Sequence, residues 1–302
     1  MIKKKSNIDG ILLLDKPQGI SSNKALQKVK KIFNAKKAGH TGTLDPMATG
    51  LLPICFGNAT KTARYLINSS KTYNVIAEFG IKTTTGDSEG EILERNSNLK
   101  IYEIKEVKKI LDTFVGKLSQ IPPMYSALKV NGTPLYKYAR KGETIKRRAR
   151  IVNIHSILIN SYDNKQIDLN ISCSKGTYIR TLIEDIAVKL GTVAYVKKLR
   201  RISLDVFKDK DMISLEQLLN TKRNELENIL KPIDYGLMHL PFITIDSEDL
   251  KRFANGQSFE SKNNIKETNL AIRIYNNERI LIGLANQKIK GEIQPVNVFT
   301  NN

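Results

Sequence analysis

Residues 39–53, with the sequence GHTGTLDPMATGLLP, contain a single acid, Asp45, among glycines, prolines and small hydroxyl residues. Glycine lets the backbone approach a ligand closely, whereas Pro46 and Pro53 fix their own φ angles and bias the preceding residues away from helix. The pattern predicts an ordered loop that presents one carboxylate, a candidate nucleophile or base. The alternative is that Asp45-Pro46 merely begins a turn.

Several separate motifs on either side of this loop recur in one family. The loop motif H-x-G-x-L-D-P-x-A-T-G-x-L-P is preceded by GILLLDKPQGISSN, and the later segments are Lys71–Tyr73, Pro122–Lys129, Gly176–Leu182 and Leu199–Arg201. Their order and spacing closely resemble the bacterial tRNA pseudouridine synthase B family over at least residues 10–207. The resemblance implies an isomerase that converts uridine 55 in the T arm of tRNA to pseudouridine without a cofactor.

Length and composition indicate a globular protein. A chain of 302 residues is too long for one ordinary core and suits a large domain with a small appendage. No apolar run is long enough to cross a bilayer and no signal peptide is evident, so we expect a cytoplasmic protein without membrane partners. Cys55 and Cys173 lack redox or metal-type spacing, and we expect neither a disulfide nor a metal.

The charge balance favours a nucleic-acid partner. The formal net charge is +19, and such a field attracts polyanions, although solvated lysines alone would also explain it. One stretch carries seven basic residues against the single acid Glu143: Lys137, Arg140, Lys141, Lys146, Arg147, Arg148 and Arg150. Tyr136 and Tyr138 lie among them, which suits phosphate contact and base stacking. We therefore expect an RNA-binding insert near 124–150. The family resemblance implies tRNA as the partner, and we expect a monomeric protein.

The periodicity of apolar residues mixes strands and helices without a regular βαβ repeat, which favours an α+β fold. Expected strands cover 10–14, 73–79, 151–159 and 167–173, and expected helices cover 23–33, 60–67, 102–115 and 177–190. Asn131-Gly132 predicts a hairpin turn. We expect a mixed, largely antiparallel sheet of the pseudouridine synthase type in a catalytic domain spanning 1–240.

Beyond residue 240 the pattern changes to a short helix at 247–254 and brief strands at 270–275, 279–284 and 296–299. This pattern predicts a small β-barrel spanning 241–302. By resemblance, it is similar to the PUA-type RNA-binding domain that often follows the catalytic domain of this family.

Arg180 is the candidate partner of Asp45. A nucleophilic carboxylate must be ionised, so we expect a neighbouring positive charge to hold the pKa of Asp45 low. A planar guanidinium can grip a carboxylate with two hydrogen bonds. The alternative is an intrahelical pair between Arg180 and Glu184. The family resemblance favours the first interpretation, and Asp45 would act on C1′ or C6, or remove a sugar proton.

The resemblance also implies roles for residues that hold an extruded nucleotide. Tyr73 would stack on the base, Tyr178 would assist proton removal from C5, and Leu199 would line the pocket. Each could instead be an ordinary core residue.

His40 could stack where the nucleotide leaves the RNA arm, and Lys16 could contact phosphate or brace the Asp45 loop. Arg140, Arg147 and Arg148 would bind the RNA backbone. A tRNA-binding folding factor, with catalysis secondary, is a rival function, and a guide-RNA-dependent synthase is a third.

Overall fold

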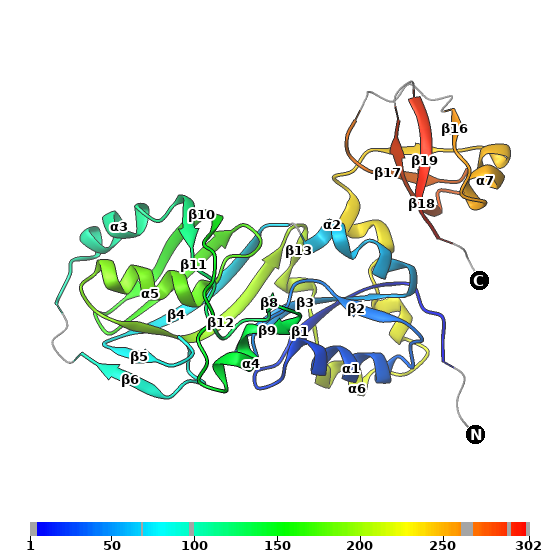
Figure 1. Ribbon diagram of the computed structural model, residues 1–302. Helices are drawn as coiled ribbons and strands as arrows, with labels where there is room; N and C mark the ends of the chain where they lie inside the picture. Colours follow the sequence, from blue (N-terminus) through cyan, green and yellow to red (C-terminus); the bar gives the residue numbers. More distant parts are fainter. Residues whose placement is uncertain (1–4, 68, 97–99, 261–267, 289–290, 300–302) are drawn as a thin grey trace.

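A ten-stranded mixed sheet dominates the computed structural model, which describes residues 5–67, 69–96, 100–260, 268–288 and 291–299 (Figure 1). Within those residues the strand order is β14-β1-β3-β12-β4-β11-β10-β7, with β2 on β3 and β13 on β12. The strands are β1 (Gly10–Lys16), β2 (Ala38–His40), β3 (Thr49–Phe56), β4 (Lys71–Phe79), β7 (Gly116–Gln120), β10 (Arg150–Tyr162), β11 (Gln166–Cys173), β12 (Ala194–Leu204), β13 (Phe207–Lys208) and β14 (Ile213–Ser214). Among the described strands of this sheet, only β1–β14 and β3–β12 pair in parallel, which confirms the α+β prediction with a largely antiparallel sheet.

Helices cover one face of this sheet. One continuous core joins the sheet to α1 (Ser22–Ile32), α3 (Ile104–Asp112), α5 (Ile179–Lys189) and α6 (Leu215–Asn220). A smaller core forms on the other face of β1 and β3, against the segment that contains α2 (Ala63–Ile67). At strands β1 and β3 the sheet is therefore buried on both faces.

The two helices that matter most for the site, α1 and α5 (Ile179–Lys189), lie close to the predicted ranges 23–33 and 177–190. The hydroxyl of Ser21 accepts a hydrogen bond of 3.2 Å from the Lys24 amide and caps α1. Tyr178 is extended and precedes α5, and Gly191, with φ +69°, follows its end. The predicted helix at 60–67 is instead a 3-10 turn, Gly57–Lys61, followed by α2.

Strand β3 corrects the expectation that Pro53 belongs to the loop. The Pro53 carbonyl accepts a 3.1 Å hydrogen bond from the Thr41 amide, and β2 stops pairing one step earlier, at His40 and Ile54. The N–H and C=O of one strand residue face the same neighbour. The backbone N–H that Pro53 lacks would therefore face the β2 side, one position beyond the last residue pair of the β2–β3 ladder. Proline is tolerated at this position because the ladder has already ended there.

The C-terminal unit, residues 241–299, has a sheet and a core of its own. Among the described residues its strand order is β15-β17-β18-β19-β16, a curled half-barrel with α7 (Ser247–Ala254) beside it. The strands are β15 (Phe242–Thr244), β16 (Phe259–Glu260), β17 (Ile272–Tyr275), β18 (Leu281–Gln287) and β19 (Glu292–Val298). The small β unit is confirmed, while the boundary at residue 240 stays a prediction.

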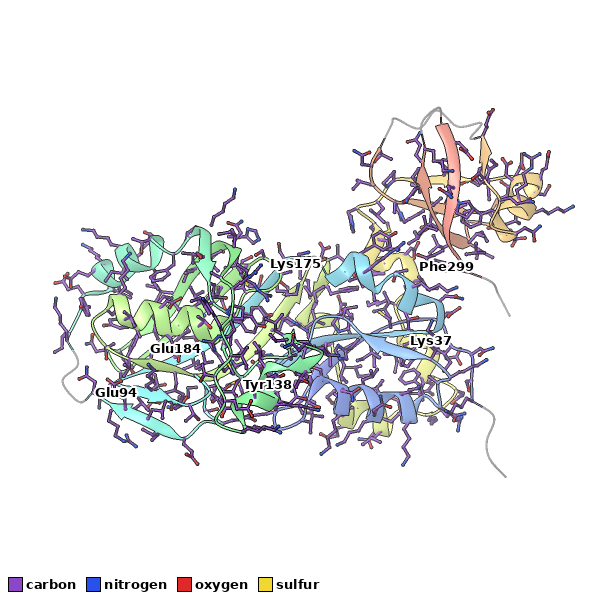
Figure 2. The ribbon with its side chains drawn as sticks, in the orientation of Figure 1. Lys37, Glu94, Tyr138, Lys175, Glu184 and Phe299 are labelled. Atoms are coloured by element: carbon purple, nitrogen blue, oxygen red, sulfur yellow. The ribbon has the colours of Figure 1, made fainter. Side chains whose placement is uncertain are left out.

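An apolar cluster joins this unit to the rest of the molecule. Phe299, labelled at the junction in Figure 2, belongs to a cluster with Leu237 and Leu284, against which Tyr65 packs. The Lys61 ammonium also donates a 2.7 Å hydrogen bond to the Val298 carbonyl.

Two expectations from composition concern the described residues directly. Cys55 and Cys173 are both free thiols and both buried. None of the described helices combines the length and the apolar character needed to cross a membrane.

Candidate active site

The Asp45 loop, residues 41–48, connects β2 to β3 and is held from both sides. Leu44 on one side of Asp45 and Met47 on the other are buried in the main core. The Ser22 hydroxyl donates a 2.9 Å hydrogen bond to the Leu44 carbonyl and accepts one of 2.8 Å from the Leu44 amide. The Gly19 amide donates to the Pro46 carbonyl at 2.9 Å. These contacts confirm the prediction of an ordered loop.

Arg180, in the first turn of α5, lies directly against Asp45. Its Nη2 is 2.9 Å from Asp45 Oδ2, and the side chains are 5% and 37% exposed. Arg180 also donates to the carbonyls of Thr85 and Tyr125, each at 2.7 Å. The guanidinium is thus fixed by three separate segments, whereas the Asp45 side chain remains partly exposed.

Asp87, which the sequence analysis did not identify, shares this guanidinium. Its Oδ2 lies 3.3 Å from Arg180 Nη1, and its side chain is 4% exposed. Among the described residues Arg180 forms no ion pair with Glu184, so the intrahelical alternative is wrong. The composition of residues 83–87, TTTGD, resembles that of the Asp45 loop in its small, hydroxyl and glycine residues and could have indicated a second ordered acid.

The pKa of Asp45 shifts in the opposite direction from the one we expected. Burial by the surrounding protein raises this pKa above the ordinary 3.8; Arg180 opposes the rise, and Asp87 adds to it. The expectation of a low pKa is wrong because the carboxyl loses water and because a second carboxylate shares its cation.

Lys16 braces the Asp45 loop through hydrogen bonds to backbone carbonyls. The residue is fully buried, and its ammonium donates to the carbonyls of Pro17 at 2.9 Å, Ile20 at 2.7 Å and Pro46 at 3.3 Å. Burial lowers the pKa of Lys16 to about 8, while Glu89 and Asp45 oppose that shift. A phosphate contact would require the ammonium to leave all three carbonyls, so the bracing interpretation fits the geometry better.

The buried ammonium of Lys16 leads to a prediction about how the free energy of unfolding depends on pH. The pKa of Lys16 is 10.5 in a solvated chain and about 8 here. The unfolded chain therefore binds more protons between these values, and the free energy of unfolding should rise with pH across that window. Urea titrations should show a smaller rise for Lys16→Met than for the wild type. Lys24→Met, at an exposed position of α1, should leave the rise unchanged, and an equal change in both variants would contradict the assignment.

Tyr73 and Leu199 lie on the same face of the sheet. In the β4–β12 ladder Leu199 pairs with Val75, and Arg201 pairs with Tyr73. Paired residues of antiparallel strands project to the same side, so these four side chains are neighbours. Tyr73 is 8% exposed and Leu199 is 7% exposed. The structure thus groups the two predicted pocket residues, and Asp45 is near enough to influence the pKa of Tyr73.

Arg201 is a second residue that the sequence analysis left without a role. It is fully buried, and it donates to the Leu51 carbonyl at 2.7 Å and to the Gly42 carbonyl at 2.9 Å. The sequence does contain a signal for this burial. Leu199 lies two residues before Arg201 on the same strand, and alternate residues of a strand face the same side, so Arg201 is expected to face the core as Leu199 does.

Tyr178 and His40 flank the site. Gln120 holds the Tyr178 peptide with hydrogen bonds of 2.8 and 3.1 Å, and the Tyr178 side chain is partly buried. The Nδ1 atom of His40 is buried and has no hydrogen-bond partner among the described residues. Burial lowers the pKa of His40, and Arg201 adds to this effect, so both favour the neutral form of the ring. The roles of both residues stay predictions.

The basic insert, residues 124–150, contains a small hairpin and one helical turn. Strands β8 (Lys129–Val130) and β9 (Thr133–Pro134) flank Asn131 and Gly132, whose φ values of +50° and +76° confirm the predicted hairpin turn. Helix α4 (Leu135–Ala139) follows, and Figure 2 labels Tyr138 on it near the middle of the molecule.

The basic side chains of this insert differ in exposure. Arg140 and Arg148 are exposed and Arg147 is partly buried. The Arg140 guanidinium lies 5.5 Å from the Tyr136 ring centre. The insert therefore offers charge and aromatic surface together, as the sequence indicated.

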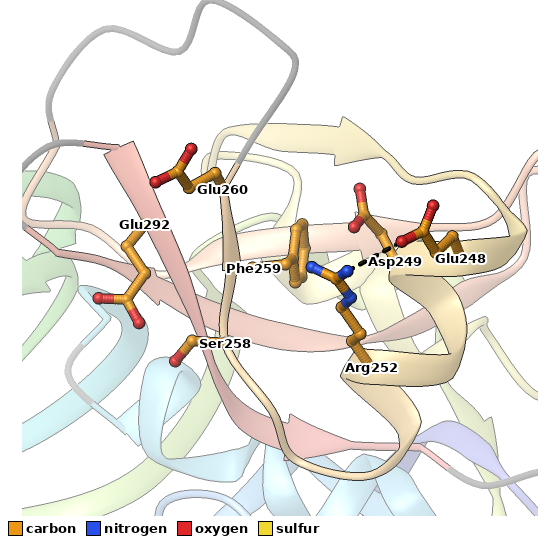
Figure 3. Close-up of a pocket in the computed structure, with 7 residues that line it drawn as sticks. All are labelled: Glu248, Asp249, Arg252, Ser258, Phe259, Glu260 and Glu292. Atoms are coloured by element: carbon orange, nitrogen blue, oxygen red, sulfur yellow. Dashed lines mark hydrogen bonds and ion pairs between the residues drawn. The ribbon is translucent and has the colours of Figure 1, made fainter.

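A separate hollow of about 600 Å³ lies on the C-terminal unit (Figure 3). Its lining residues are Glu248, Asp249, Arg252, Ser258, Phe259, Glu260 and Glu292. The one guanidinium there pairs with Glu248 at 2.8 Å, so carboxylates dominate. This hollow would repel a phosphate backbone and contains none of the candidate site residues.

Family models match nearly the whole chain. Residues 30–179 match the TruB family pseudouridylate synthase N-terminal domain, and residues 180–238 match the tRNA pseudouridylate synthase B C-terminal domain. Residues 241–299 match the model described as pseudouridine synthase II TruB, C-terminal.

Relatives and solved structures agree with these matches. The chain is 44% identical to tRNA pseudouridine synthase B of Methylobacillus flagellatus, covering 96% of this chain and 95% of the relative. It is 46% identical to the enzyme of that name from Buchnera aphidicola subsp. Acyrthosiphon pisum, covering 94% of each. A protein in an H/ACA ribonucleoprotein bound to substrate RNA containing 2′-deoxyuridine shares the fold, with a TM-score of 0.73, 22% identity, and coverage of 97% of this chain and 85% of that one. These matches show that this chain, with its partly exposed aspartate beside a buried arginine, belongs to the TruB family of tRNA pseudouridine synthases, which are isomerases.

Proposed function

We propose that this enzyme isomerises uridine 55 in the T arm of tRNA, with Asp45 as its catalytic carboxylate. The observation that carries the proposal is the contrast in exposure across one ion pair, where the Arg180 side chain is buried and the Asp45 side chain remains partly exposed. A residue that only stabilised the fold would have no need of that access. The relatives named above supply the tRNA substrate class.

The reaction breaks the bond from N1 of uracil to C1′, turns the base and joins C5 to C1′, so no donor or oxidant takes part. Asp45 can form a covalent bond at C1′ or C6, or accept a proton from the sugar. All three routes use the same carboxylate and need it ionised. Arg180 favours that state and fixes the carboxylate in place.

The target base must leave its stack to reach Asp45. Tyr73 and Leu199 would enclose the extruded base, because they lie side by side on the sheet face that meets the Asp45 loop. A neutral His40 ring would stack near the entry, and Tyr178 would assist proton removal from C5. Arg140, Arg147 and Arg148 of the basic insert, together with the PUA-like C-terminal unit, would bind the RNA backbone.

Mapping pseudouridine in an unmodified tRNA transcript after incubation with the enzyme tests this proposal. We expect one new pseudouridine at position 55 and none in a transcript with cytidine at that position. An isolated T-arm stem-loop should also be modified, because the proposed contacts involve that arm. Modification elsewhere in the tRNA would overturn the assigned position.

The shifted pKa of Asp45 predicts the acid limb of the reaction. Because that pKa lies above 3.8, the rate of a single turnover should fall at a higher pH than an unshifted aspartate would require. A raised folded pKa also means that protonation of Asp45 does not itself destabilise the fold. The rate should therefore fall while circular dichroism stays unchanged. A limb that coincides with unfolding would contradict this prediction.

A further inference from the structure

Arg201, on the central strand β12, links the start of the Asp45 loop to strand β3, which follows the loop. Its side chain bonds the carbonyl of Gly42, before Asp45, and that of Leu51, after it. Its backbone pairs with Gly50, where an added Cβ would lie 2.3 Å from the Arg201 carbonyl oxygen. Strand β12 therefore packs directly on the exit of the loop, and only glycine fits there.

The same guanidinium lies beside Tyr73. The two residues are cross-strand partners, and the positive charge of Arg201 opposes the burial that raises the pKa of Tyr73. The remaining nitrogen, Nη1, makes no hydrogen bond of normal geometry with any described residue. One side chain thus contacts the loop that carries the carboxylate and neighbours the ring expected to stack on the base.

A contribution to the stability of the fold does not explain well why an arginine is buried at position 201. Among the described residues it has no carboxylate partner, and burial lowers its pKa. Burying a charge against neutral carbonyls is expensive, and apolar residues often replace buried charges without loss of stability. The fixed angles between guanidinium donors do, however, suit two carbonyls that must stay at a set separation.

We infer that Arg201 is a positioning residue of the isomerase, fixing the Asp45 loop against the strand that carries Tyr73 so that carboxylate and ring meet the same nucleotide. This inference rests on the roles proposed above for Asp45 and Tyr73. A lysine at this position would keep the charge but could not hold both carbonyls in the same geometry.

Single-turnover rates, tRNA dissociation constants and melting temperatures of Arg201→Lys and Arg201→Met test this inference. A displacement of about 1 Å at a reacting group can lower a rate by about 10²-fold, and we expect losses of that order in both variants. Affinity for tRNA should stay within about threefold of the wild type, because Arg201 is buried and does not touch RNA. Equal losses of rate and affinity, or an unchanged rate, would overturn the inference.

Arg200→Lys is the matched control. Arg200 is the next residue on the same strand, projects to the other face and pairs with Asp15 at 2.8 and 2.9 Å. Its side chain is partly exposed, and we expect an unchanged rate. If Arg201 variants fold poorly, Gly42→Ala perturbs the same contact from the loop, since its Cβ would lie 3.2 Å from Arg201 Nη1 at a φ of +72°. It should show the same split between rate and affinity.

A double-mutant cycle with Tyr73→Phe separates positioning from a general structural role. If Arg201 acts partly through Tyr73, the combined loss of rate should be smaller than the product of the single losses. Independent, multiplicative losses would overturn the inference. An inactive Asp45→Asn variant beside fully active Arg201 variants would sink only this inference, whereas an active Asp45→Asn variant would sink the proposed function itself.

Discussion

Asp45→Asn should lower the single-turnover rate of pseudouridine formation by about 10⁴-fold or more, the order of loss seen when a reacting group is removed. The amide is close in size to the carboxylate, so the loop should keep its contacts with Ser22 and Lys16. It cannot act as a nucleophile or a base, and affinity for tRNA should change by no more than a fewfold. Asp112→Asn, on the exposed face of α3, is the control that should keep full activity.

The same variant separates the enzyme from the rival folding-factor function. If the protein refolds tRNA independently of catalysis, Asp45→Asn should refold misfolded tRNA as well as the wild type does. Loss of refolding together with turnover would count against an independent folding role. Substantial turnover by purified Asp45→Asn would refute the catalytic assignment.

Arg180→Lys should lower the rate by about 10²- to 10³-fold, since one ammonium cannot reproduce a planar, multidentate donor. Arg180 contacts Asp45, Asp87 and two backbone carbonyls at once. A lysine would leave at least one buried partner unsatisfied, and an unpaired buried charge costs about 3–5 kcal/mol. We therefore expect a lower melting temperature as well. Arg95→Lys, on the exposed strand β6 (Ile92–Arg95), should change neither property.

An Asp87→Asn variant helps interpret that result. Asp87→Asn removes the second carboxylate that pairs with Arg180. If Arg180→Lys loses activity only because the fold is less stable, Asp87→Asn should likewise lower the melting temperature and the rate together. If Arg180 acts on the carboxylate, rates measured well below the melting temperature should still fall for Arg180→Lys. Rates equal to the wild type under those conditions would contradict the role assigned to this arginine.

The sequence predicted what depends on local pattern. The spacing of apolar residues indicated helices close to α1 and α5, and Asn131-Gly132 indicated a hairpin. The composition around Asp45 indicated an ordered loop. The motif containing Arg180 identified the partner of Asp45 only through the family resemblance, because sequence spacing alone favoured a pair with Glu184.

What the sequence did not predict depends on pairing between distant strands. The outer strand β14 and the placement of β12 between β3 and β4 follow from ladders that join residues more than a hundred positions apart. Arg201 gains its significance from those ladders, and Asp87 gains its own from the ion pair with Arg180, which is distant in the sequence. The direction of the Asp45 pKa shift was also missed, because it is the sum of burial and of charges on three separate segments.

The sheet order has a consequence for how the protein is made. The first strand pairs with β3 on one side and, on the other, with β14, where Leu14 faces Ile213. A nascent chain therefore displays the Asp45 loop long before Arg180 and Arg201 leave the ribosome. Non-local pairing of this kind slows folding and leaves strand edges exposed. Translation that stalls before β12 should yield fragments that lack Arg201 and Leu199, cannot assemble the active centre, and depend on chaperones to stay soluble.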